Sequence, residues 1–370
     1  MGEIPGMVTQ VRPAPRSVRI GALVPRTRPG WVEAGAHLLA GLELAIEDIN
    51  IAGGILGRPL ELVVRDTAAD PRRAVAAVDE LARLDVAALA GEYHSVVARA
   101  AAARADALGL PFLCSSAVLD ELVEQPTDRV ARLAPPQSLG WQTYADFLVR
   151  AGRDRIAVAI QPSVYWAAGT RILRESFASR GGAVLEFDAR VHTPAALCDA
   201  LIEQGATALL LLVGHPDPAV PIVEAVRRDS RLDDILLGAP AGQPEFPEWT
   251  KALGAAGAGI PFLRYLPERL SVLGDRVEPR LRARLGVAPL FVALEGYDTI
   301  TVLAEVLRTP GAEVAASWAR VAVEGTRGSI RFARVPGLNV WQWAGAPIQV
   351  VDRDPARPER FRVLHTHPAE

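Results

Sequence analysis

Apolar positions along the chain fall into two alternating patterns, short continuous runs and helical spacings. Residues 17–25, SVRIGALVP, are rich in β-branched side chains and end in a proline- and arginine-containing loop, which is typical of a buried strand. Leu38, Leu42 and Ile49 then recur at helical intervals until Asn50 and two glycines follow. The pattern predicts a strand followed by an amphipathic helix, the first unit of a βα array.

The βα alternation runs through two successive arrays. The first array continues with predicted strands at 60–64, 86–91 and 110–116 and helices at 70–84 and 96–108. The alternation restarts after 134–138, with a helix at 139–150, further helices from about 166 onward, and strands at 155–161, 183–189, 206–214 and 234–240. Two such arrays in tandem predict an α/β protein with two parallel-sheet lobes flanked by helices.

The last third of the chain breaks this regularity. A connection rich in glycine and proline, 255–267, precedes predicted helices at 291–307 and 312–324. Predicted strands at 328–332 and 340–352 follow, and the tail from Pro355 is expected to be weakly ordered.

Composition narrows the classes of partner. The chain has 370 residues, is 50% hydrophobic and carries a net charge of −3 with both signs interspersed, so we expect no nucleic-acid partner. Its longest apolar run, 208–213, is too short to cross a bilayer, and we expect no membrane insertion. Residues 1–17 contain Pro, Glu and Arg where a secretory signal needs an apolar stretch. We therefore expect a cytoplasmic protein with reduced cysteines, unless the native start lies upstream.

Signatures of catalysis are missing from the sequence. The patterns G-x-x-x-x-G-K-[ST], G-x-S-x-G, H-E-x-x-H and C-x-x-C do not occur. We accordingly expect that the protein is not an enzyme and that it has no cofactor and no metal site.

Polar and aromatic residues gather just after the predicted strands. In open parallel sheets, ligands bind beyond the carboxyl ends of the strands. Reading past each predicted strand gives the segments RTRPGW (26–31), EYHS (92–95), SSAV (115–118), PSVYW (162–166), HPD (215–217) and AGQ (241–243). Aromatic walls with a few polar groups are typical of a small-molecule pocket.

Each of these residues also has an ordinary structural interpretation. Ser95 can cap the helix that follows it, or it can hold a ligand oxygen at the positive end of that helix. Tyr93 and Tyr165 can be core aromatics, and a histidine such as His94 or His215 can be a structural donor. Glu92 and Trp166, which also follow predicted strands, can likewise have either a ligand-binding or an ordinary structural role.

Several blocks, in order, resemble the class I periplasmic binding proteins of the branched-chain amino-acid type. These blocks are GLELAIEDINIAGGILGRPLELVVRD (41–66), ALAGEYHS (88–95), LGLPFLCSSAVLDEL (108–122) and EGYDTITVLAEVL (295–307). The resemblance implies two Rossmann-like lobes joined by three hinge crossovers, expected near 134–139, 258–267 and 333–339. It divides the chain into an extension (1–17), lobe 1 (18–136 plus 262–336), lobe 2 (137–261 plus 337–354) and a C-terminal tail (355–370).

Residues at matching positions supply the expected ligand site. Ser95 stands where the family has its carboxylate-binding serine, and Val118 stands where the leucine binder has a threonine. No carboxylate lies near Ala241, where the family's acid neutralises the ligand's ammonium group. The expected ligand-binding residues are Tyr93, His94, Ser95, Ser115, Ser116, Ala117, Val118, Tyr165, Trp166, His215 and Gln243.

A second resemblance is to a cytoplasmic amide sensor that represses an amidase operon and shares the transport fold. GEYHS (91–95) is similar to its G-x-Y-x-S pocket segment. The disulfide pair of the periplasmic family falls on Ala69 and His94 in this chain, so that disulfide is expected to be absent. The sequence therefore predicts a non-catalytic receptor for an amino acid, amide or related solute. Its expected partner is an ABC permease or, alternatively, a regulator protein.

Overall fold

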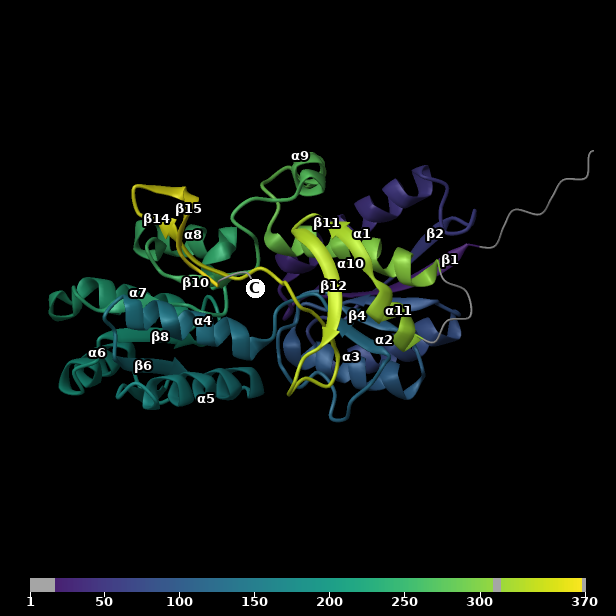
Figure 1. Ribbon diagram of the computed structural model, residues 1–370. Helices are drawn as coiled ribbons and strands as arrows, with labels where there is room; N and C mark the ends of the chain where they lie inside the picture. The colour runs from purple at the N-terminus through teal and green to yellow at the C-terminus, as the bar shows by residue number, and fades with distance from the viewer. Residues whose placement is uncertain (1–16, 309–313, 368–370) are drawn as a thin grey trace, which may run out of the picture.

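Two α/β lobes make up the computed structural model, which describes residues 17–308 and 314–367 (Figure 1). Each lobe contains a sheet built mainly of parallel strands, with helices on both faces. The predicted fold class, two Rossmann-like lobes joined by crossovers, is confirmed.

The first lobe contains the larger sheet. Its strands, in spatial order, are β11 (Ala322–Gly325), β12 (Gly328–Arg334), β13 (Trp341–Trp343), β5 (Val130–Arg132), β4 (Phe112–Cys114), β3 (Ala88–Gly91), β1 (Val18–Val24) and β2 (Leu60–Asp66). The strands from β13 to β2 pair in parallel, while β12 and β11 add an antiparallel edge. Parallel strands are covered on both faces, which explains their continuous apolar runs.

Helices cover both faces of this sheet. One face carries α1 (Val32–Ile51), α9 (Val272–Leu285), α10 (Phe291–Leu307) and α11 (Val314–Arg320), and the other carries α2 (Pro71–Arg83) and α3 (Ser95–Ala107). Helices α1 and α10 cross closely at Gly41, where an added Cβ would lie 1.9 Å from the Ala293 carbonyl oxygen. Only glycine allows this approach.

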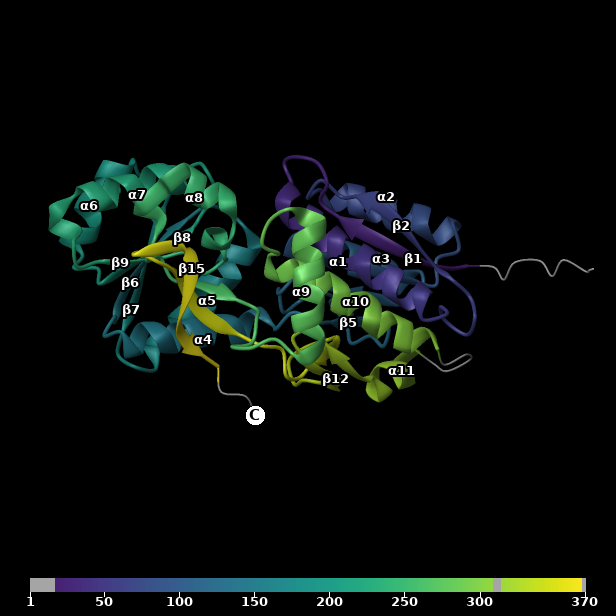
Figure 2. The same ribbon diagram turned by 90° about the horizontal axis from the view of Figure 1, so that it is seen from above.

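The second lobe has a smaller parallel sheet between two helical layers (Figure 2). Its strand order is β7 (Ala183–Asp188), β6 (Arg155–Ile160), β8 (Ala208–Leu212) and β9 (Leu236–Gly238). Helices α4 (Gln137–Arg150) and α5 (Val164–Ala178) cover one face, and α6 (Pro194–Glu203), α7 (Ala219–Arg228) and α8 (Pro247–Leu253) cover the other. An antiparallel sheet of β10 (Phe262–Arg264), β14 (Gln349–Asp354) and β15 (Arg357–Thr366) packs against α4.

Three crossovers join the lobes, at 133–136, 265–271 and 344–348. The second and third lie later in the chain than the expected 258–267 and 333–339. Strand β10 therefore belongs to the second lobe, and β13 to the first. Gln342 explains the position of β13, because its side chain accepts a hydrogen bond from Arg132 Nε at 2.7 Å and donates to the Ala134 carbonyl.

Two further expectations for the C-terminal third are wrong. The predicted helix at 312–324 is divided between α11 and strand β11, and its first residues lie outside the described range. The tail from Pro355 forms strand β15, which pairs with β14 as an edge strand. Its many charged side chains suit an exposed edge, and they concealed the strand pattern.

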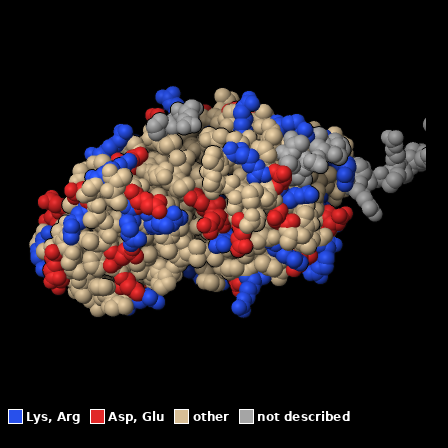
Figure 3. All heavy atoms as spheres, turned by 60° about the horizontal axis from the view of Figure 1, so that its bottom comes forward, with Lys and Arg blue, Asp and Glu red and all other residues tan. Residues whose placement is uncertain are grey.

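Charged side chains of both signs lie on the surface of the protein (Figure 3). Figure 3 shows positive and negative side chains interspersed over the face it presents. Within 17–308 and 314–367, no helix is long and apolar enough to cross a membrane. Cys114 and Cys198, the two cysteines of the chain, are buried and unpaired.

Candidate functional site

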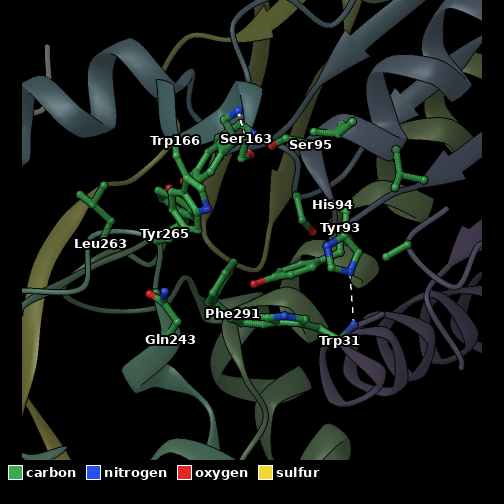
Figure 4. A pocket seen from close by; sticks show the side chains of 18 of the residues that line it. Trp31, Tyr93, His94, Ser95, Ser163, Trp166, Gln243, Leu263, Tyr265 and Phe291 are labelled. Atoms are coloured by element: carbon green, nitrogen blue, oxygen red, sulfur yellow. Dashed lines mark hydrogen bonds between the residues drawn. The ribbon is translucent and has the colours of Figure 1, made fainter. Parts of the chain in front are cut away.

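A cavity of about 290 Å³ lies between the two lobes (Figure 4). Its walls come from loops and helix starts beyond the carboxyl ends of both parallel sheets, as expected for this architecture. The lining residues are Trp31, Ala69, Pro71, Tyr93, His94, Ser95, Val96, Val97, Ser116, Val118, Ser163, Tyr165, Trp166, Ala241, Gly242, Gln243, Leu263, Tyr265 and Phe291. None of these described lining residues is Asp, Glu, Lys or Arg, so the wall carries no formally charged side chain.

Aromatic rings form most of the wall. In the first lobe, Trp31 stacks on Tyr93 with ring centroids 5.8 Å apart. Trp31 also meets Phe246 of the second lobe edge-on at 4.6 Å, so these rings join the lobes at one side of the cavity. Tyr165 and Trp166 face them from the start of α5, with centroids 4.9 Å apart. Flat aromatic surfaces on both lobes suit a flat or apolar ligand.

Ser95 lies at the first turn of α3 but does not cap that helix, contrary to the structural interpretation considered for it. The N-cap is His94, whose side chain makes no capping bond. Ser95 Oγ instead accepts hydrogen bonds from the backbone N–H groups of Val118 and Leu119, at 3.2 and 3.3 Å. Since both acceptor positions of the hydroxyl are used, its O–H is left to donate.

The backbone of α3 supplies further donors beside Ser95. Ala98 N is the first amide of this helix to bond within it, to the His94 carbonyl. The preceding amides, including those of Val96 and Val97, have no intrahelical acceptor, and both residues line the cavity. The helix dipole adds partial positive charge at this end. This part of the wall therefore favours a ligand oxygen with negative charge.

His94 is neutral in this position. Its Nε2 accepts a hydrogen bond from the backbone N–H of Trp31 at 3.2 Å, which places the ring hydrogen on Nδ1. Burial lowers the pKa of His94 to about 4. Burial also raises the pKa of Tyr165 to about 12 and that of Tyr93 well above its ordinary value. The cavity wall is thus uncharged at neutral pH.

Glu92 supports this wall from behind and does not line the cavity. It is fully buried, and it accepts hydrogen bonds from the Tyr93 and His94 amides at 2.8 and 2.9 Å and from Thr67 Oγ1 at 2.5 Å. Burial raises the pKa of Glu92 to about 7, although these donors favour the ionised form. Its role in the described structure is to position the 92–95 segment.

Replacement of Glu92 by glutamine is expected to stabilise the protein at pH 8 and to change little near pH 5. A carboxyl with a raised pKa in the folded state stabilises that state at low pH. This stabilisation is lost between the ordinary pKa of 4.5 and about 7, and it amounts to on the order of 3 kcal/mol. Glutamine keeps both amide contacts without ionising. Melting temperatures of the native and E92Q proteins, measured from pH 4 to pH 8, should diverge over this interval, and a constant offset would contradict the assignment.

Gln243 faces the cavity from the second lobe. Its Nε2 donates to the Val213 carbonyl at 3.1 Å, and this bond fixes the orientation of the amide because a carbonyl can only accept. Gln243 is only 3% exposed, and its Oε1 has no hydrogen-bond partner within the described chain. Figure 4 shows Gln243 at the edge of the cavity, below Leu263 and Tyr265.

Most of the residues predicted from the sequence come together here. The cavity is lined by eight of them, Tyr93, His94, Ser95, Ser116, Val118, Tyr165, Trp166 and Gln243. Ser115 and Ala117 do not line it, since successive side chains of an extended segment alternate in direction and these two are fully buried behind it. His215 does not line this cavity either, for another reason. Its ring packs against Trp249 and borders a separate hollow of about 70 Å³ with Glu33 and Glu248.

Other lining residues were not predicted. Trp31 lies in a segment that the strand-end rule had selected, but it was not singled out. Leu263 and Tyr265 come from β10 and the second crossover, and Phe291 from the first turn of α10. The sequence around these three residues has no pattern that marks them as lining residues, because their position at the cavity depends on the path of the crossovers.

Comparisons with known proteins match this chain to binding proteins. A family model described as periplasmic binding protein matches residues 17–340. The Leu/Ile/Val-binding protein homolog 7 of Brucella melitensis biotype 1 is 29% identical over 191 residues, which are 48% of this chain and 47% of that protein. The chain thus aligns with about half the length of this curated relative.

Solved structures share the fold over nearly the whole chain. A leucine binding protein from Thermotoga maritima superposes with a TM-score of 0.78 at 19% identity, covering 94% of this chain and 97% of that one. A solute binding protein of an ABC transporter from R. palustris, solved in complex with benzoate, gives a TM-score of 0.77 at 17% identity. It covers 96% of this chain and 97% of that one.

Proposed function

Because this chain belongs to the periplasmic binding protein family, we propose that it is a non-catalytic receptor that encloses one small solute between its lobes, as the substrate-binding component of an ABC importer. The observation that carries the proposal is the cavity whose walls come from both lobes. A ligand that contacts both walls stabilises the closed arrangement over an open one. Closure is the signal that a permease can recognise.

The chemistry around Ser95 favours binding over catalysis. A nucleophilic serine needs a base beside its hydroxyl, whereas Ser95 Oγ is held by the amides of Val118 and Leu119. The lining residues instead offer hydrogen-bond donors and aromatic surface, which are sufficient to hold a solute.

A cytoplasmic sensor that acts on a regulator protein is the second candidate. One observation favours it: both cysteines are buried and unpaired, as a reducing compartment permits. The two candidates use the same ligand site and differ only in the partner that responds to closure. Co-purification with a permease supports the importer, and co-purification with a regulator supports the sensor.

A ligand screen with a matched pair of serine variants tests the receptor proposal. Branched-chain amino acids, short amides, urea and aromatic acids are compared by thermal shift, where a true ligand raises the melting temperature with concentration. We expect S95A to weaken the best ligand more than tenfold, about 1.4 kcal/mol, by removing a donor from the cavity.

The exposed Ser179 provides the control, because S179A removes a hydroxyl far from the cavity wall. It should leave affinity unchanged. If no compound of the panel changes the melting temperature, or if S95A and S179A bind equally, the assignment of the site is wrong.

A further inference from the structure

Arg132 is a fully buried cation whose contacts within the described chain are all with uncharged groups. It is the last residue of β5, and its side chain has no solvent exposure. Its Nε donates to Gln342 Oε1 at 2.7 Å, and its Nη1 donates to the carbonyl oxygens of Val118 and Leu119 at 3.1 and 2.6 Å. A buried charge without an ionic partner costs free energy, which an apolar residue of similar size does not. The position of Arg132 therefore needs an explanation beyond the filling of space.

The contacts of Arg132 lead to Ser95 through one peptide group. The Val118 carbonyl oxygen and the Leu119 N–H belong to the same trans peptide, so they point in opposite directions. Arg132 holds this oxygen at 3.1 Å, and the N–H donates to Ser95 Oγ at 3.3 Å. The Val118 N–H is the second donor to the same Oγ, at 3.2 Å. Arg132 is thus separated by two hydrogen bonds from Ser95, which lines the cavity.

A cation at one end of such a chain strengthens the hydrogen bonds that follow it. Hydrogen bonds in series polarise one another, and the effect is larger inside a protein than in water. The charge of Arg132 draws electron density toward the Val118 oxygen, which makes the Leu119 N–H a stronger donor. Ser95 Oγ, with both acceptor positions used, then becomes a stronger donor through its own O–H. The donor strength of Ser95 consequently depends on a residue that does not line the cavity.

Arg132 also connects this peptide to the hinge. It lies opposite Gln342 in the parallel pairing of β5 with β13, and these strands lead into the first and third crossovers. Gln342 Nε2 donates to a carbonyl of the first crossover at 2.8 Å, which keeps Oε1 directed toward Arg132. The Val118 carbonyl also accepts from the Gln137 N–H at 2.6 Å, at the start of α4 in the second lobe. This carbonyl is therefore held from the hinge and from the second lobe at once.

Resting on the receptor function proposed above, we infer that Arg132 is a positioning residue for ligand binding, which orients and polarises the Ser95 hydroxyl through the Val118–Leu119 peptide. Arg132 itself does not contact the ligand. Its loss leaves two carbonyl oxygens and Gln342 Oε1 without their donor, so the peptide is no longer fixed against Ser95. Ligand affinity falls as a result, although every side chain of the cavity wall is kept.

A double-mutant cycle with S95A tests this role. Titration calorimetry with L-leucine and benzoate or, if neither binds, with the panel compound of largest thermal shift compares the native protein, R132M, S95A and the double variant. We expect R132M to weaken binding at least tenfold in the native background but less than threefold in the S95A background, because the hydroxyl on which Arg132 acts is then absent. Equal losses in both backgrounds would overturn the assignment, since damage that does not act through Ser95 adds independently.

Hydrogen exchange in the ligand-free protein measures the positioning without any compound. Amides of residues 116–120 should exchange at least tenfold faster in R132M. The control R129M removes an exposed guanidinium from the Gly109 carbonyl just before β5, and it should change neither exchange of 116–120 nor affinity by more than twofold. Unchanged exchange in R132M would contradict the assignment.

The variant R132K replaces R132M in both measurements if R132M does not fold. It keeps the charge but lacks the fork that reaches Gln342 and both carbonyls together, so the same dependence on Ser95 is expected. Failure of every compound in the thermal-shift panel would count against the receptor function itself. The exchange measurement would still decide whether Arg132 fixes the Val118–Leu119 peptide.

Discussion

Replacement of Arg327 by methionine is expected to lower the free energy of unfolding by about 3–5 kcal/mol, because it leaves two buried carboxylates without their cation. Arg327 lies in the turn between β11 and β12, with its side chain fully buried. It contacts Glu295 Oε1 at 3.1 Å and Asp298 Oδ2 at 3.0 Å, both on α10. It also donates to the Tyr265 carbonyl at 3.3 Å and so connects α10 to the second crossover.

The loss in R327M should shrink toward pH 5. Burial raises the pKa of Glu295 to about 7 and also raises that of Asp298, so Glu295 becomes protonated in the folded state as the pH falls below 7. A neutral carboxyl no longer needs the cation. Urea unfolding at pH 8 and pH 5 measures both effects.

An exposed ion pair supplies the control for this experiment. Arg308 and Glu305 pair at 2.9 Å on the surface end of α10, with side chains 46% and 42% exposed. R308M should cost less than about 1 kcal/mol at either pH. Equal losses in R327M and R308M would show that the buried network does not hold α10 to the β11–β12 turn.

Replacement of Trp31 by alanine is expected to weaken ligand binding about 30- to 100-fold, or about 2–3 kcal/mol, which is the range of an aromatic hot spot. The indole contacts Tyr93 in its own lobe and Phe246 in the other, so its loss removes both cavity wall and closure contact. The backbone N–H that holds His94 is kept in W31A. Calorimetry with the tightest compound of the panel gives the affinity, and stopped-flow measurement should place most of the change in the dissociation rate.

Trp341 is a matched control for this variant. It lies on β13 away from the cavity, where its ring packs under the Arg334 guanidinium at 4.6 Å. W341A should reduce stability without changing affinity more than about twofold, well below 1 kcal/mol. Similar losses of affinity in both variants would mean that Trp31 acts through stability alone.

The sequence predicted the fold well where the βα periodicity was regular. Apolar patterns located most strands of both parallel sheets, although β5 was not predicted. The rule that ligands bind beyond strand ends selected segments that meet at the cavity. Tyr93 and Ser95 follow β3, Ser116 follows β4, and Tyr165 follows β6. These positions were predictable because the carboxyl ends of parallel strands all lie at the same edge of a sheet, so residues that follow the strands meet there.

Other parts were not predictable for physical reasons. Tyr265 and Phe291 reach the cavity only because the chain crosses back to the first lobe, a long-range feature without a local pattern. His215 does follow a strand, but its ring packs against Trp249 and faces a different hollow. The hydrogen bonds to Ser95 Oγ depend on a loop more than twenty residues away, so the sequence could not show which of its roles applies.

A crystal structure of the protein with the tightest-binding compound of the panel is the most direct test of ligand binding between the lobes. We expect one ligand enclosed there, with an oxygen within hydrogen-bond distance of Ser95 Oγ and its body between the rings of Trp31 and Trp166. A ligand bound on the outer surface of a single lobe, with the cavity between the lobes holding only water, would contradict it.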